Sequence, residues 1–174
     1  PVIQLSRSTD HAGIGSIFAH ANSVGLQMDV FELLTAKFAT EDPTFRLQED
    51  WEKTEKILRA YPALAEIDRT EFLTSVALYV TAKKGHASAF RESIIELTLD
   101  EYRPVADTMR LAFHEAANFM AHRCIITTSQ VPYSAQLVPL AVIVALLAER
   151  PGVLSQQQAW DRIHQWFWCG VFGE

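Results

Sequence analysis

The stretch IFAHANSVGLQMDVFELLTAKF, residues 17–38, decides the fold. Its first part runs into a turn at NSVG, residues 22–25, and its second part begins with Asp29 three positions before Glu32. An Asp at a helix start accepts hydrogen bonds from the first backbone N–H groups, and a Glu three residues later reaches back to the Asp backbone. Apolar residues then recur at helical spacing as far as Phe38. The stretch therefore predicts a loop that leads into an amphipathic helix.

Three further stretches carry the same signature of a helix start. They begin at Asp68, Thr98 and Ser155, each followed three positions later by Glu or Gln. Pro139 lies in the apolar run VPLAVIVALLA and predicts a kink or a late helix start there. Gly85 follows two lysines and is typical of a helix end. Together these signals predict helices over residues 29–40, 47–61, 71–84, 99–124 and 134–149 and from 155 onward, with a short apolar segment at 90–97.

The predicted fold class is therefore all-α, a multi-helix bundle with a short N-terminal strand remnant at Val2–Leu5. A chain of 174 residues fits one domain, in which we expect residues 1–28 to be a junction segment and residues 29–174 the helical bundle. The chain begins with Pro1 and stops in the apolar run WFWCGVFGE. From these ends we expect a fragment of a larger protein.

Composition limits the function classes. Hydrophobic residues make up 49% of the chain and charged residues 21%, which is typical of a globular and not a disordered protein. The net charge of −6 argues against a broad nucleic-acid surface. The run VPLAVIVALLA is too short to cross a bilayer, so we expect a buried core helix and no membrane association. Cys124 and Cys169 lie among apolar neighbours and are expected to be buried free thiols, compatible with the cytoplasm.

Searches for catalytic motifs find no candidate. His114-Glu115 has the form of a zincin start, but Asn118 stands at the position of the second His, and His122 lies on another part of the helix face. There is no P-loop, no G-x-S-x-G and no paired cysteine and histidine. We therefore predict no catalytic residue and no metal site in the chain. The charged residues between 49 and 56 predict a solvated face with the pairs Glu49–Lys53 and Glu52–Lys56.

Two other features allow two interpretations each. The cluster Trp160, Trp166 and Trp168 is either a partner groove or stacking platform, or an intramolecular aromatic core, and few basic neighbours favour the core. At the turn of residues 22–25, Asn22 either presents its amide to a ligand or caps the turn through its own side chain. Residue types alone favour the cap.

Six separate segments carry a resemblance to a known family. They are PVIQL (residues 1–5), IFxxxNSxG (17–25), VFELLTA (30–36), IIELT with EY (94–102), VPYSxQLxPL (131–140) and WFWCGVFGE (166–174). In these segments the chain resembles the GmrSD-type, modification-dependent restriction proteins, whose N-terminal domain is related to the ParB and sulfiredoxin-like nuclease fold. Two departures stand out: Val24 replaces a glycine that is common in the family, and the family's Asp-Gly-Gln-Gln-Arg signature is absent, belonging upstream of residue 1.

This resemblance implies that the chain is the helical scaffold of a prokaryotic DNA-defence enzyme, a nucleotide-dependent nuclease acting on modified DNA. Asn22, Ser23 and Gly25 would be the ligand-facing residues, orienting a ligand through a side-chain amide or backbone N–H. The parent protein would use GTP or ATP with Mg²⁺, whereas the fragment would hold no cofactor and be inactive alone. Its partner would be the missing nuclease-fold part of the same chain, and it would meet DNA only through that parent.

The alternative interpretation is a non-enzymatic helical interaction module whose Trp-rich C-terminal helix docks a partner. A fragment separated from its sheet is also expected to expose an apolar patch near residues 2–18 and to self-associate.

Overall fold

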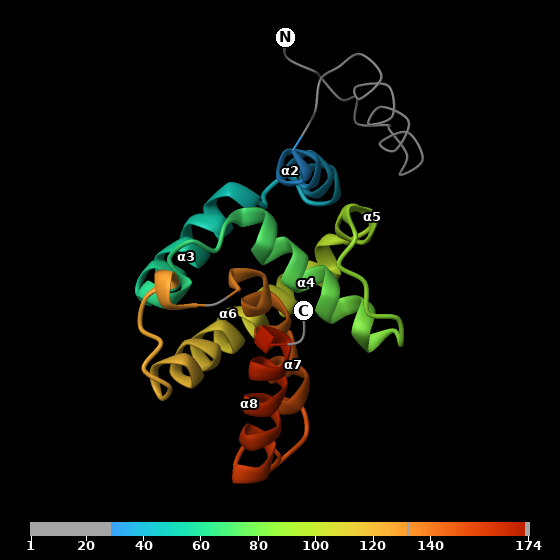
Figure 1. The fold of residues 1–174 in the computed structure, drawn as a ribbon. Helices are drawn as coiled ribbons and strands as arrows, with labels where there is room; N and C mark the ends of the chain where they lie inside the picture. Colours follow the sequence, from blue (N-terminus) through green and yellow to red (C-terminus); the bar gives the residue numbers. More distant parts are fainter. Residues whose placement is uncertain (1–28, 132, 173–174) are drawn as a thin grey trace.

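The computed structural model describes residues 29–131 and 133–172, and within them it contains helices and no strand (Figure 1). The all-α bundle is thus confirmed. The strand expected at Val2–Leu5 and the junction segment 1–28 lie outside the described residues. The α-helices are α2 (Val30–Glu41), α3 (Leu47–Arg59), α4 (Arg69–Lys83), α5 (Arg91–Ile95), α6 (Leu99–Ala121), α7 (Leu137–Ala148) and α8 (Gln157–Phe172), and the 3-10 helices are η1 (Pro62–Leu64), η2 (Thr128–Gln130) and η3 (Ser134–Gln136).

Reciprocal capping boxes open three of the helices where the sequence predicts them. In each box the N-cap side chain accepts from the backbone N–H three residues later, and the Glu at that position accepts from the N-cap backbone. These bonds satisfy N–H groups that have no partner within the helix. The N-cap residues are Asp29 for α2, Asp68 for α4 and Thr98 for α6.

The starts of α7 and α8 have a different origin. The chain forms the 3-10 turn η3 before α7 begins at Leu137, so Pro139 lies in the first turn and the late start is confirmed. The capping box predicted at Ser155 is wrong. Its hydroxyl donates to the carbonyl of Gly152 (2.7 Å), and α8 begins only at Gln157.

Two helices end in the same left-handed cap. Gly85 follows α4 with φ of 90°, and Cys124 follows α6 with φ of 58°. In both caps the residue after the left-handed one donates its backbone N–H back into the last turn, which defines the Schellman motif. These bonds join His86 N to Thr81 O (3.1 Å) and Ile125 N to Met120 O (3.1 Å).

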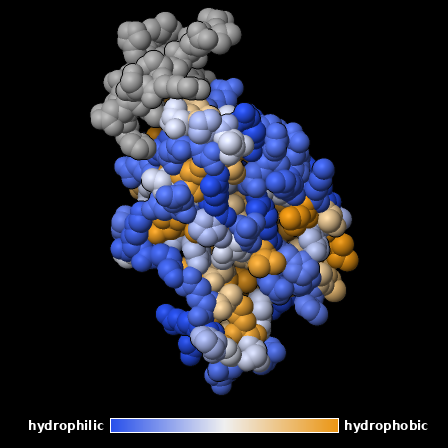
Figure 2. Space-filling view, turned by 180° about the vertical axis from the view of Figure 1, so that it is seen from behind, coloured by the Kyte–Doolittle hydropathy of each residue, from blue (hydrophilic) through white to orange (hydrophobic). Residues whose placement is uncertain are grey.

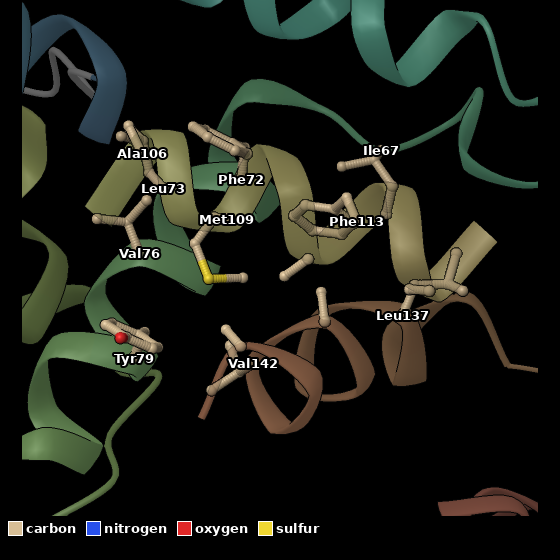
Figure 3. Close-up of a cluster of buried hydrophobic side chains, with 14 of the residues drawn as sticks. Ile67, Phe72, Leu73, Val76, Tyr79, Ala106, Met109, Phe113, Leu137 and Val142 are labelled. Carbon is tan, nitrogen blue, oxygen red and sulfur yellow. The ribbon is translucent and has the colours of Figure 1, made fainter. Parts of the chain in front are cut away.

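The core lies where α4, α6 and α7 meet (Figure 3). Val76 from α4 and Met109 and Phe113 from α6 are fully enclosed. α7 faces them with Leu137 and Val142, and seven of its twelve residues are buried. The run VPLAVIVALLA is therefore a core helix, as its length predicts.

A polar clamp joins α3 to α6. The guanidinium of Arg110 forms an ion pair with Asp50 and donates through Nε to Thr54 Oγ1 (2.9 Å). The hydroxyl of Tyr102 donates to the same carboxylate (2.8 Å). Burial, reinforced by the charge of Asp50, raises the pKa of Tyr102. Asp50 therefore does not belong to a solvated face, contrary to the sequence prediction.

The rest of α3 also differs in detail from expectation. The apolar periodicity of this helix predicts that Trp51, Ile57 and Leu58 all face inward; Trp51 and Leu58 are buried, but Ile57 is 37% exposed. The ion pair on its surface is Glu55–Arg59 (3.1 Å), instead of the predicted pairs starting at residues 49 and 52.

A second polar link joins α4 to the end of α7. Glu149 accepts a hydrogen bond from the hydroxyl of Tyr79 and forms an ion pair with Lys83. Burial and the bond to Glu149 raise the pKa of Tyr79 to about 12. The bonds from Lys83 and Tyr79 lower the pKa of Glu149.

No helix in the described part of the chain combines the length and apolar character needed to cross a bilayer.

Candidate functional site

The ligand-facing residues predicted from the sequence, Asn22, Ser23 and Gly25, lie outside the described residues. Within residues 29–131 and 133–172, a cleft of about 660 Å³ lies between the C-terminal part of α6 and the first turns of α8. We call it the α6–α8 cleft. Its volume falls in the range of small-molecule sites. Residues that line it include Glu115, Phe119, His122, Arg123, Trp160 and His164.

Arg123 holds the cleft together. Its guanidinium carbon lies 3.5 Å from the ring centroid of Phe119, and Nη1 donates to the Phe119 carbonyl (2.8 Å). Its Nε donates to Nδ1 of His164 on α8 (2.6 Å), so one side chain connects the end of α6 to α8. Burial lowers the pKa of Arg123, and the charge of Asp161 opposes that shift.

Trp160 and His164 form the aromatic side of the cleft, and contacts with neighbouring residues hold both rings in place. Trp160 stacks on Phe119 with a centroid distance of 6.0 Å, and its indole N–H donates to the carbonyl of Leu154 (2.8 Å). His164 accepts from Arg123 at Nδ1, which places the proton of its neutral ring on Nε2. The ring of His164 also packs edge-on to Trp168, with centroids 6.2 Å apart.

The cleft therefore offers an aromatic face, N–H donors and the carboxylate of Glu115. This combination suits the recognition of a small planar polar molecule. In the described part of the chain no three His, Cys, Asp or Glu side chains are grouped so as to hold a metal ion.

Both ring nitrogens of His114 face hydrogen-bonding partners within the fold. Its Nδ1 is hydrogen-bonded to the hydroxyl of Tyr61, and Nε2 faces the amide of Asn118 (3.2 Å). Asn118 is the residue that stands where a zincin has its second His. The histidine thus ties α6 to the loop after α3.

Lys37 is a buried lysine, only 6% exposed, and such groups often mark functional sites. Its Nζ donates to the carbonyl of Ile95 (2.9 Å), which links α2 to α5. Burial lowers the pKa of Lys37, and the charges of Glu41, Glu101 and Glu96 oppose the shift. Because its ammonium is bonded within the fold, we assign Lys37 a packing role.

The tryptophan cluster divides between the two interpretations. Trp160 and Trp168 pack within the molecule, and the ring centroids of Trp168 and Phe167 are 5.6 Å apart. Trp166, in contrast, is 37% exposed.

Both cysteines are exposed, so the expectation of buried thiols is wrong. Cys124 occupies the left-handed cap of α6, a turn that reaches the surface.

Sequence reasoning missed the cleft because its walls come from two helices. One signal was present: Trp160, His164 and Trp168 recur every fourth residue and so share a face of one helix. Arg123, which contacts that face of α8, lies just after the end of α6 in a stretch with no recognisable motif.

Comparison of the chain with protein-family models, with curated proteins and with solved structures finds no match in any of the three.

Proposed function

We propose that the chain is the helical scaffold of a prokaryotic, cytoplasmic DNA-defence protein of the modification-dependent restriction type. The observation that carries the proposal is a contact between two of the separate segments on which the resemblance rests. Gln136 comes from VPYSxQLxPL and Gly170 from WFWCGVFGE. A Cβ built on Gly170 would lie 2.0 Å from Nε2 of Gln136, and that amide donates to the carbonyl of Phe167 (3.4 Å).

Other residues of the resemblance also occupy structural positions. Glu101 completes the capping box of α6, and Tyr102 is buried at the α3–α6 clamp. Phe31 and Leu34 of the segment VFELLTA lie in the core. Residues that a fold needs are those that distant relatives would share, which supports a common architecture.

In this proposal Asn22, Ser23 and Gly25 orient a ligand at the junction with the nuclease-fold part of the parent protein. GTP or ATP with Mg²⁺ would bind in that other part. DNA would contact the parent and not this bundle, whose chain carries a net charge of −6.

The test is a nuclease and nucleotide-hydrolysis assay on the chain alone and on the full-length parent, with modified and unmodified DNA. We expect nucleotide-dependent cleavage of modified DNA by the parent and none by the chain. Robust turnover by the chain alone would overturn the proposal.

A second candidate is a non-enzymatic interaction module, favoured by the exposed Trp166 on α8, because tryptophan is enriched at interface hot spots. The sequence encoded upstream of Pro1 separates the two candidates. The Asp-Gly-Gln-Gln-Arg signature there supports the DNA-defence protein, and its absence supports the module.

A further inference from the structure

A second hollow lies on the other side of α8. This α7–α8 groove has a volume of about 380 Å³. Ile143 and Leu147 of α7 and Ile163 of α8 are among its apolar residues, and Trp166 lies at its side. Figure 2 shows apolar surface that continues toward the lower end of the molecule, the end at which α7 and α8 lie in Figure 1.

The charges at the groove are all positive. Arg150 and Arg162 line it, and no carboxylate does. Neither arginine has an ion-pair partner among the described residues, although the chain as a whole carries a net charge of −6.

The acidic neighbours of these arginines are engaged elsewhere. Glu149, next to Arg150, is bonded to Tyr79 and Lys83 of α4. Asp161, next to Arg162, accepts from Nε2 of Gln157 (2.9 Å). Neither of these sequence-adjacent carboxylates forms an ion pair with Arg150 or Arg162, so the two guanidinium groups are available to an incoming acidic group.

We infer that the α7–α8 groove binds an acidic amphipathic helix of a partner protein. Apolar side chains of such a helix, spaced i, i+3/i+4 and i+7, would contact the floor at Ile143 and Leu147. Its flanking carboxylates would pair with Arg150 and Arg162. The exposed Trp166 supplies the aromatic residue that interface hot spots favour. A nucleic acid would match the charge but leave the apolar floor without a partner.

This inference rests on the second candidate function and gives it a surface and a partner class. The interaction-module function and the proposed binding at the groove can fail separately. The upstream sequence decides whether the chain is an interaction module and says nothing of the groove, whereas the binding experiment below depends only on the groove.

The experiment measures binding of two labelled synthetic peptides by fluorescence anisotropy. Both form the same amphipathic helix with Leu at i, i+3/i+4 and i+7, and one carries Glu and the other Lys on its flanks. We expect the Glu peptide to bind at least about tenfold more tightly, with an affinity that falls as salt is added. The Arg150→Glu/Arg162→Glu variant should reverse the preference, and Trp166→Ala should weaken both peptides by about tenfold or more.

The matched control is Lys53→Glu/Lys56→Glu, which changes the net charge equally but on the exposed face of α3. It should leave the preference for the Glu peptide unchanged. Equal binding of the two peptides, absence of binding, or an equal effect of the α3 variant would overturn the inference. Concentration-dependent dimerisation abolished by Arg150→Glu/Arg162→Glu would also overturn it, because the occupant would then be a second copy of the chain.

Discussion

Arg110 of α6 and Asp50 of α3 form an ion pair in which the side chains are only 12% and 16% exposed. The same carboxylate accepts from Tyr102, so it is the shared acceptor of two residues on α6. A charged group that is mostly removed from water needs its partners, and the removal of one partner is costly.

We therefore expect Asp50→Ala to lower the free energy of unfolding by about 2–4 kcal/mol. Tyr102 loses its acceptor, and Arg110 keeps only Thr54 and the exposed carboxylate of Asp107 as side-chain partners. Urea unfolding followed by circular dichroism measures the change. The control is Arg59→Ala, which removes the exposed pair with Glu55 and should cost no more than about 0.5 kcal/mol. Equal effects of the two variants would show that the clamp does not stabilise the fold.

Tyr79 predicts a loss of stability at high pH. Burial and the bond to Glu149 raise its pKa from 10.0 to about 12, so the folded state holds the phenol proton more tightly than the unfolded state. Its contribution to stability is complete below pH 10.0 and is lost as the pH rises through about 12. Unfolding measured across this range should show the loss in the wild type and a smaller one in Tyr79→Phe. Tyr133→Phe, at an exposed position, is the control and should behave as the wild type.

The two left-handed caps predict opposite effects of substitution. Cys124→Gly should raise the free energy of unfolding by about 1 kcal/mol, because glycine adopts a positive φ without the steric cost borne by cysteine. Gly85→Ala should lower it by about 1 kcal/mol or more. No atom lies within 4 Å of a Cβ built on Gly85, so backbone strain alone would cause that loss. A shift of the same sign in both variants would contradict this account of the caps.

Gly170 and Gln136 predict a coupling between two substitutions. Helix propensity alone makes Gly→Ala in a helix stabilising by about 1 kcal/mol. A Cβ on Gly170 would lie 2.0 Å from Nε2 of Gln136, so the flexible end of that side chain must move and its bond to the carbonyl of Phe167 is weakened. We therefore expect Gly170→Ala to stabilise the protein by less than about 0.5 kcal/mol, and the same substitution in a Gln136→Ala background to stabilise it by about 1 kcal/mol. Additive effects in this double-mutant cycle would mean that the two side chains do not compete for space.

The predictions that succeeded depend on neighbours in sequence. The boxes of Asp29, Asp68 and Thr98 each involve four consecutive residues, so a local pattern suffices to place the helix starts. The box at Ser155 has the same pattern, yet its hydroxyl bonds backward to Gly152 and the helix begins later. Local competition of this kind is not visible in residue types alone.

The features that were missed depend on residues far apart in the chain. Tyr102 lies 52 positions from its acceptor Asp50, and Arg123 lies 41 positions from His164 in the α6–α8 cleft. Nothing near these residues signals their partners. The position of Cys124 could not be foreseen either, because the apolar sequence around it includes Ile126, which the structure leaves 58% exposed.

Helix α8 is a wall of both hollows, yet among its described side chains only Ile163 and Phe167 are buried. A helix with so few buried side chains opens at a lower free energy than the core helices, and its amide hydrogens should exchange before theirs. When α8 detaches, the cleft and the groove disappear together. Any molecule bound in either would then slow exchange along the whole helix, so occupancy of one hollow would favour occupancy of the other without a contact between the two ligands.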